Sequence, residues 1–242
     1  MNGAASDIEA MAVVIPVRNE QDLLERCLES VRAAAEVARE NGTPVSLWVV
    51  LDVCTDESAR IAAKFPAATI AVDARSVGVA RAAGVRAALR TFRRVPLERV
   101  WIAHTDADSM VPAHWLIHQA ALADSGADVV VGTVRPDFRD LSAAQIDAWH
   151  ARHVPGVANG HVHGANLGTR ASVLVEAGGF PRIPAHEDVQ VVERMRARDA
   201  TIIATDGAWV LTSGRQAGRA KGGYADYLRT QLVPTAPEPR AV

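Results

Sequence analysis

"VWIAHTDADS", residues 100–109, places two acids shortly after a run of four apolar residues. The run Val100 to Ala103 is short and continuously apolar, which is typical of a strand buried on both faces of a parallel sheet. Asp106 and Asp108 follow where such a strand would end. Because ligands bind outside the carboxyl ends of the strands in open α/β sheets, this stretch predicts both the kind of sheet and one edge of a site.

The same strand-then-helix pattern recurs through the first half of the chain. The apolar runs predict strands over 12–17, 46–51, 68–72, 100–103 and 128–134, with helices over 20–40, 56–65, 77–91 and 112–122. Strands that alternate with helices predict an α/β fold, a mostly parallel Rossmann-like sheet flanked by helices. The polar residues Asn19, Asp52, Asp73 and Asp106 all follow predicted strands, so we expect them along one edge of the sheet.

The second half of the chain is less regular. Helical patterns occupy 141–153, 171–177 and 187–198, residues 154–168 are expected to be mostly loop, and 201–212 predicts two short strands around Asp206-Gly207. No repeat or linker divides the chain. We therefore expect a flexible N-terminus over 1–10, one domain over 11–232, and a flexible Pro-rich tail over 233–242.

Composition limits the function classes. The chain has 242 residues, 49% of them apolar and 22% charged, with a net charge of −2, which argues against nucleic-acid binding through bulk charge. No apolar run approaches the roughly 18 residues of a membrane span, and the first ten residues lack the features of a signal peptide. The two cysteines, Cys27 and Cys54, show no metal spacing, so a reduced chain in the cytoplasm is favoured. Nothing indicates the oligomeric state.

The acid pair itself has three interpretations. Asp108 or Ser109 could cap the helix expected near Pro112, but capping accounts for one acid only. The two carboxylates could act together as a general acid and base. They could also bind Mg²⁺ or Mn²⁺, which typically takes one or two protein carboxylates and completes its shell with substrate phosphates. The residues of this stretch alone leave the three interpretations open.

Six stretches in a fixed order carry a resemblance to a known family. They are VVIPVRNEQDLLERCLESV (13–31), VVLDVCTDES (49–58), VGVARAAGVRAAL (77–89), HTDADS (104–109), HGANLGTRASVLVEAGGFP (163–181) and HEDVQVVERM (186–195). Together they resemble the family 2 glycosyltransferases, whose GT-A fold binds nucleotide sugars. The resemblance covers roughly residues 11–215 and implies a nucleotide-binding half over about 11–110 and an acceptor half, with a smaller β region, over about 111–232.

The resemblance also implies a role for individual residues. It implies that the donor nucleotide is contacted by Pro16, Arg18, Asn19 and Glu20 of the entry motif. It also implies that Asp52 binds the base, that Arg81 lies against the base or phosphates, and that Asp106 lies near the ribose. It makes 106–108 a DXD motif, with Asp108 on a Mn²⁺ or Mg²⁺ ion, and Asp188 the catalytic base. It implies that the acceptor or donor-sugar side of the site is lined by His163, Gly164, Ala165, Asn166 and Glu187.

Three other features have alternative interpretations. The stretch TSGRQAGRAKGG (212–223) could fold over the donor diphosphate through Arg215 and Arg219, or be a solvated basic loop. His150, His153, His161 and His163 could hold zinc, but no cysteine accompanies them, and His161 and His163 could instead line the acceptor pocket. Trp101 and Trp115 are expected in the core, whereas Trp149 could stack on a sugar.

The chain departs from the family pattern at three places. One acid, Asp52, stands in Leu51-Asp52-Val53-Cys54 where the family usually has two, so the nucleotide base stays open. The Gln-x-x-Arg-Trp motif and the membrane helices of processive synthases are absent from the sequence, which argues against a processive synthase. His104 stands before the acid pair, where the family usually has an apolar residue.

These observations predict a metal-dependent, inverting glycosyltransferase that acts in the cytoplasm or at the inner face of a membrane. The expected donor is a nucleoside diphosphate sugar, and the expected acceptor is a small molecule or a lipid-linked one. A retaining transferase, a nucleotidyltransferase and a non-catalytic nucleotide-sugar-binding module are the alternatives. Asp188 could also be no more than a charge favoured by a helix dipole.

Overall fold

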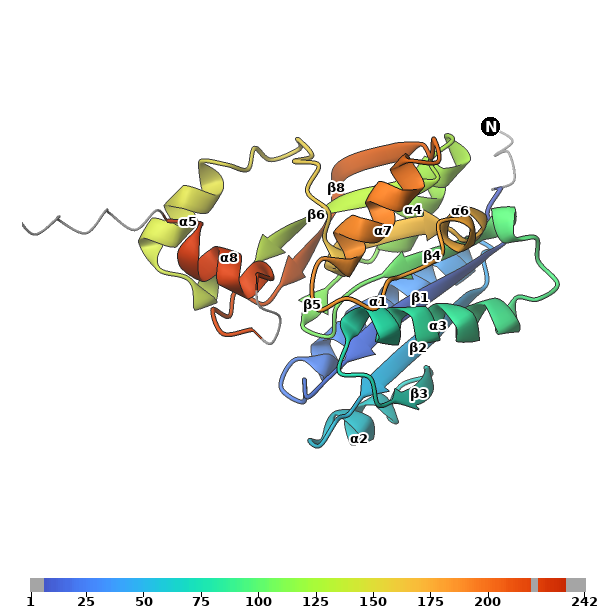
Figure 1. Ribbon diagram of the computed structural model, residues 1–242, viewed down its shortest axis with the longest axis horizontal. Coiled ribbons are helices and arrows are strands. Elements are labelled where there is room, and N and C mark those ends of the chain that lie inside the picture. The colour runs from blue at the N-terminus through green and yellow to red at the C-terminus, as the bar shows by residue number, and fades with distance from the viewer. Residues whose placement is uncertain (1–6, 219–221, 234–242) are drawn as a thin grey trace, which may run out of the picture.

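The computed structural model describes residues 7–218 and 222–233 and contains one eight-stranded sheet flanked by helices (Figure 1). The strands are β1 (Ala10–Val17), β2 (Val45–Asp52), β3 (Ala68–Val72), β4 (Val100–His104), β5 (Ser109–Met110), β6 (Val129–Pro136), β7 (Leu167–Arg170) and β8 (Ile202–Thr212). The helices are α1 (Leu24–Glu40), α2 (Ser58–Ala62), α3 (Val77–Thr91), α4 (Trp115–Asp124), α5 (Ala143–His150), α6 (Ala171–Glu176), α7 (Glu187–Arg196) and α8 (Tyr224–Thr230). The strand order is β3-β2-β1-β4-β7-β6-β8-β5.

The predicted mostly parallel sheet is confirmed. Strand β1 pairs in parallel with β2 and with β4, β2 pairs in parallel with β3, and β6 pairs in parallel with β8. The sheet is covered on both faces, with α1 and α4 on one side and α3, α6 and α7 on the other (Figure 1). This covering requires apolar side chains on both faces of the central strands, and their sequences show such runs.

Alternate residues of β1 divide between two cores. Met11, Val13 and Ile15 pack toward α1, whereas Ala12 and Val14 pack toward α3. The helix α3 lies close to the sheet because Gly84 has no side chain, and a Cβ there would come within 2.4 Å of Val14 Cγ1. This close packing brings the first turn of α3 to the carboxyl ends of the central strands, where the predicted site residues lie.

Three strands differ from the sequence-based expectation. Strand β7 lies partly in a stretch expected to be loop, and it pairs antiparallel with β4 and β6. Residues 202–212 form one strand rather than two, and a register shift in its pairing with β6 absorbs the irregular 206–207 region. The two-residue strand β5 starts one residue after Asp108 and pairs with the end of β8. These strands are set by distant partners, which a local pattern does not show.

Helices α5 and α8 form a small lobe that projects from the ends of β6 and β8 (Figure 1). Its core consists of Trp149, Leu228 and Leu232, and Gln145 Nε2 donates a hydrogen bond of 2.8 Å to the Leu228 carbonyl. Trp149 is only 7% exposed, because it packs in this core and lies flat against His153 at 4.0 Å between ring centroids. Trp149 is therefore a core residue and not the sugar-stacking residue that we considered from sequence.

The chain ends lie mostly outside the described residues. Of the predicted flexible N-terminus, residues 7–10 are described: Ile8 is buried, the Asp7 amide donates to Asp124 Oδ1 at 2.9 Å, and Ala10 is the first residue of β1. Of the predicted tail, only residue 233 is described. No helix within 7–218 and 222–233 is long and apolar enough to cross a membrane. The cytoplasmic location stays a prediction.

Candidate functional site

A cavity of about 650 Å³ opens at the carboxyl ends of β1, β2 and β4, a volume in the usual range for ligand pockets. It brings together most of the residues predicted from sequence. Those that line it are Pro16, Arg18, Glu20, Asp52, Arg81, Asp106, Asp108, His163, Gly164, Ala165, Glu187, Asp188 and Arg215. Arg219 and Lys221 lie outside the described residues.

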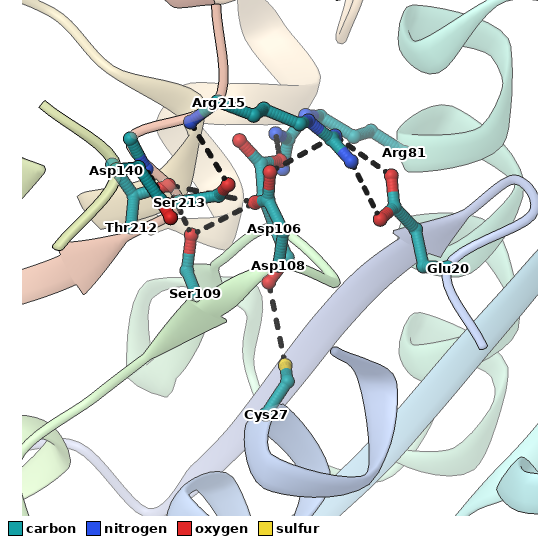
Figure 2. A network of polar contacts seen from close by, with 11 residues as sticks. Glu20, Cys27, Arg81, Asp106, Asp108, Ser109, Asp140, Thr212, Ser213 and Arg215 are labelled. Carbon is teal, nitrogen blue, oxygen red and sulfur yellow. Dashed lines mark hydrogen bonds and ion pairs between the residues drawn. The ribbon is translucent and has the colours of Figure 1, made fainter. Parts of the chain in front are cut away.

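Asp108 is held in a crowded polar network (Figure 2). Its Oδ1 accepts hydrogen bonds from the hydroxyls of Ser109 at 3.2 Å and Thr212 at 3.4 Å, and its Oδ2 lies 2.9 Å from Arg215 Nη2. Burial and the neighbouring charge of Asp106 raise the pKa of Asp108 to about 6, although Arg215 opposes them. The fold therefore holds a carboxylate where a further positive charge would be favourable.

Arg215 connects Glu20 with the acid pair across this cavity. Its guanidinium donates two hydrogen bonds of 2.8 Å to the two carboxylate oxygens of Glu20, and it also reaches Asp108 (Figure 2). These contacts, above all the hydrogen bonds to Glu20, raise the pKa of Arg215. Arg215, the first arginine of the stretch 212–223, thus lies between two carboxylates.

Arg81 is a buried counterion for two acids. Its side chain is 1% exposed, its Nε lies 3.3 Å from Glu187 Oε1, and its Nη2 donates to Asp106 Oδ1. Gly164 permits this position, because a Cβ at Gly164 would come within 2.3 Å of Arg81 Nη2. Arg81 therefore fixes Asp106 and Glu187, and the resemblance did not indicate this pairing.

Asp52 stabilises the start of α3. Its Oδ1 accepts hydrogen bonds of 2.9 Å from the amides of Ala74 and Arg75, and its Oδ2 accepts one of 2.8 Å from the Ser76 amide. Ser76 directly precedes α3, so the carboxylate satisfies amides at the entry to that helix. Asp52 lines the cavity as expected, but backbone amides already engage both of its oxygens.

Two asparagines predicted in the site lie outside the cavity lining. Asn19 adopts a left-handed backbone with φ of 50°, and its Oδ1 accepts a hydrogen bond of 2.8 Å from the Thr55 amide. The Asn166 side chain is buried, with Oδ1 accepting from Trp115 Nε1 and Nδ2 donating to the carbonyls of Thr133 and Ala208. We therefore correct both assignments: these side chains tie loops and strands together.

Asp188 lies in the first turn of α7 and lines the cavity. Its Oδ2 accepts a hydrogen bond of 2.7 Å from the Gly164 amide, and its Oδ1 accepts one of 2.8 Å from the Val189 amide. Two backbone donors thus hold the carboxylate in one orientation, while further lone pairs of both oxygens stay available. Such a group can accept a proton from a ligand placed beside it.

The histidines do not form a metal cluster. His153, His161 and His163 line the cavity, but no group of three or more His, Cys, Asp or Glu side chains in the described part of the chain is arranged to hold a metal ion. Burial lowers the pKa of His163 to about 4, so its ring is neutral at pH 7. The zinc alternative therefore has no support from the described residues.

His104 lies behind the acid pair and outside the cavity lining. Its ring is fully buried and packs edge-on against Phe180 at 4.7 Å between centroids, and burial lowers its pKa well below the ordinary value. Neither ring nitrogen has a hydrogen-bond partner among the described residues. His104 therefore packs as a neutral ring in a position that an apolar residue could fill.

Several residues of the cavity were not predicted from sequence. Tyr224 and Tyr227 of α8 line it, together with Ser76 and His186. The tyrosines come from a seven-residue helix near the chain end, and its placement depends on packing against α5. The sequence offers no motif that would have linked this helix to the acid pair.

The raised pKa of Asp108 predicts a pH-dependent stability of the metal-free protein. The folded state keeps the Asp108 proton up to about pH 6, whereas the unfolded chain loses it near pH 4, so stability falls as pH rises across this window. We expect Asp108→Asn to be more stable than wild type at pH 7 by about 1–2 kcal/mol, and to lose that advantage near pH 4. Urea unfolding with a chelator present, at several pH values, measures the difference. If the stability of Asp108→Asn relative to wild type is the same at pH 4 and at pH 7, the carboxylate of Asp108 is not destabilised by burial.

Comparisons with known proteins agree with the geometry. The family model described as Glycosyl transferase family 2 matches residues 12–157. The crystal structure of S. aureus TarS 1–349 in complex with UDP-GlcNAc is similar in fold, with a TM-score of 0.64 and 15% identity over 89% of this chain and 61% of that one. A mannosyltransferase from Pyrobaculum calidifontis, PcManGT in complex with GDP-Man and Mn²⁺, has a TM-score of 0.59 and 19% identity over 95% of this chain and 74% of its own. No curated protein matches in sequence. The predicted GT-A-type fold is confirmed, and the chain spans about three fifths of the TarS fragment.

Proposed function

The chain belongs to glycosyl transferase family 2, and from this premise we propose that it transfers a sugar from a nucleoside diphosphate sugar to an acceptor hydroxyl. One observation carries the proposal: the acid pair and Asp188, about 80 residues apart in sequence, face the same cavity of about 650 Å³. The cavity is large enough for a nucleotide and a sugar together. In this proposal the acid pair acts at the leaving group, and Asp188 acts at the acceptor hydroxyl.

The charge of the cavity supports a divalent ion. The described lining residues include six acids (Glu20, Asp52, Asp106, Asp108, Glu187 and Asp188) and four arginines (Arg18, Arg75, Arg81 and Arg215). A diphosphate is itself anionic, so this lining would repel it without an added cation. Asp108 and Asp106 supply the hard oxygen ligands that Mn²⁺ and Mg²⁺ take, and donor oxygens would complete the shell. When bound, such an ion stabilises the charge that develops on the departing diphosphate.

Arg215 adds a second positive charge at the same place. It now bridges Glu20 and Asp108, so a cation on Asp108 would release one of its contacts. A guanidinium forms paired hydrogen bonds with phosphate oxygens, and Arg215 is half-exposed toward the cavity. We therefore place Arg215 on the diphosphate in the donor complex. Arg219, predicted to act with it, lies outside the described residues.

Asp188 is proposed as the base of a single displacement. The acceptor oxygen forms a bond to the anomeric carbon, the bond from that carbon to the diphosphate oxygen breaks, and its electrons leave with the diphosphate. The hydroxyl proton passes to Asp188, whose orientation the amides of Gly164 and Val189 fix. Attack from the face opposite the leaving group inverts the anomeric centre.

Donor binding tests the proposed function. We expect one nucleotide sugar among UDP-GlcNAc, UDP-glucose and GDP-mannose to raise the melting temperature in the presence of Mn²⁺ or Mg²⁺, because a ligand of the folded state stabilises it. Asp108→Ala should weaken metal-dependent donor binding by about tenfold or more, equivalent to about 1.4 kcal/mol. Isothermal titration calorimetry measures the affinities.

The exposed acid Asp147, outside the cavity, gives the matched control, and Asp147→Ala should bind as wild type does. Equal donor binding with and without the metal would remove the metal from the proposal. Failure of wild type to bind a wide panel of nucleotide sugars under any condition would remove the proposed function itself.

A further inference from the structure

One end of the cavity is lined by histidine and tyrosine rings. His153, His161 and His163 come from the segment after α5, whereas Tyr224 and Tyr227 come from α8. We call these five side chains the ring wall. His163 contacts Tyr224 with ring centroids 5.5 Å apart, and Tyr224 stacks on Tyr227 at 5.9 Å. His161 lies 6.2 Å from His163, so four of the rings form a continuous row made by two segments, and His153 is stacked on Trp149.

The ring wall begins beside the proposed base. His163 directly precedes Gly164, whose amide donates to Asp188 Oδ2 at 2.7 Å. On the other side of Asp188, its neighbour Glu187 pairs with Arg81, which also holds Asp106. Asp188 therefore lies at the boundary between the charged part of the cavity and the ring wall. An acceptor whose hydroxyl reaches Asp188 would rest against these rings.

No arginine or lysine belongs to the ring wall, and His163 is neutral at pH 7. Burial lowers the pKa of His163 to about 4 and lowers the pKa of His153 below its ordinary value, and burial raises the pKa of Tyr224. The arginines among the described lining residues are at positions 18, 75, 81 and 215, and none comes from the two segments that carry the ring wall. Asp188 is the acid beside His163, and His153 lies near both a cation, Arg152, and an acid, Asp206.

This chemistry suits alcohols and disfavours anions. A neutral imidazole offers one hydrogen-bond donor and one acceptor, and a phenol offers both, which complements sugar hydroxyls that also donate and accept. Aromatic side chains with a polar tip supply both an apolar face and a hydrogen bond to a ligand. A phosphate or carboxylate offers acceptors only, and here it would lose water without gaining an arginine or lysine partner from the two segments.

We propose that the ring wall is the acceptor subsite and that it takes an uncharged sugar residue or glycoside, with no phosphate or carboxylate on the unit that receives the new bond. The inference rests on the proposed function, because it uses Asp188 as the base. It adds the chemical class of the acceptor. It also makes Tyr227 a specificity-determining residue, since Tyr227 lies at the end of the ring wall remote from Asp188.

Acceptor binding without any donor tests the ring wall by itself. Saturation-transfer NMR with the full chain measures binding of matched pairs of ligands. Each pair consists of a methyl glycoside of glucose, galactose or mannose and the same methyl glycoside carrying a 6-phosphate. We expect a neutral member to bind, with its affinity reduced about fivefold to tenfold by Tyr227→Ala, the loss of one stacking ring. We expect Tyr227→Arg to gain binding of the phosphorylated member. Trp209→Ala is the control, since Trp209 is 41% exposed and outside the cavity lining.

The outcomes separate the two proposals. Preference of wild type for the phosphorylated member, or binding of neither, would overturn the ring wall as a neutral acceptor subsite. Unchanged neutral binding in Tyr227→Ala, at an unchanged melting temperature, would overturn it as well. If neutral glycosides bind but no nucleotide sugar does, the proposed transfer reaction is wrong and the proposed acceptor subsite still holds. Once the donor has been identified, Tyr227→Ala should raise the KM for the acceptor and leave the KM for the donor unchanged.

Discussion

Asp188→Asn is expected to bind the donor as wild type does and to lose about 10²–10⁴-fold in kcat, the range that a positioned general base contributes. The acceptor hydroxyl must lose its proton as it attacks, and the amide of asparagine cannot accept that proton. The proposed donor contacts, Asp106, Asp108 and Arg215, form ion pairs that do not include Asp188, so they should not change. Calorimetry for the donor and a product assay for turnover measure the two effects separately.

The substitution also has a local structural effect that needs a control. An asparagine keeps one oxygen acceptor for the amides of Gly164 and Val189, but its NH₂ group would face the other amide, a donor against a donor. Thermal unfolding of the variant reports this cost. Glu193→Gln, an exposed acid on the same helix, is the matched variant that should change neither turnover nor stability.

Two results would contradict the assignment of Asp188. Turnover within about threefold of wild type would show that the proton goes elsewhere, since a lost general base costs far more. Retention at the anomeric centre, read from the coupling constants of the product, would exclude a single displacement even if Asp188→Asn is inactive. In that case the retaining mechanism considered from sequence becomes the better interpretation.

The half of the fold that carries the acid pair could be predicted from sequence for a local reason. A strand buried on both faces must be apolar throughout, so β1, β2 and β4 appear as short continuous runs. The acids that follow them meet at one edge because parallel strands end together. Helical connections predict parallel strands, but the order of the strands comes from the structure.

The rest could not be predicted, because it depends on partners far away in the chain. Strand β5 has two residues, and it exists because Ser109 and Met110 pair with the end of β8. The ring wall needs α8 beside α5, and this contact rests on Trp149 and Leu228 rather than on a motif. Short elements with weak local preference are decided by such packing.

The polar residues at strand ends show a further limit of sequence interpretation. Asp52, Asp106 and Asn166 all fall near the ends of strands, yet only Asp106 presents a partly exposed side chain to the cavity, with 38% of it accessible. Asp52 caps backbone amides, and Asn166 is buried among carbonyls. A buried polar group must find partners, and the sequence does not say whether those are backbone groups or a ligand.

Arg81→Met is expected to cost about 3–5 kcal/mol of stability, because it leaves a buried carboxylate without its partner. The Arg81 side chain is 1% exposed and that of Glu187 is 6% exposed, so solvent cannot replace the lost charge. Asp106 would lose its orientation at the same time, and donor binding should fall with it. Chemical denaturation measures the stability, and Arg32→Met, which breaks an exposed pair with Glu36, should change it by about 0.5 kcal/mol or less.

A second substitution shows whether the charge or the shape of Arg81 is responsible. If the uncompensated charge of Glu187 causes the loss, the double variant Arg81→Met with Glu187→Gln should recover more than half of it, because no buried carboxylate then remains at that position. Burial already raises the pKa of Glu187 with Arg81 present, and without Arg81 it should rise further. The folded state of Arg81→Met would then bind a proton that the unfolded chain releases near pH 4, so its deficit should be larger at about pH 8 than at about pH 5. A deficit that is independent of pH and not recovered in the double variant would mean that Arg81 acts through packing against Gly164 and Phe180, and not as the counterion that orients the acids of the cavity.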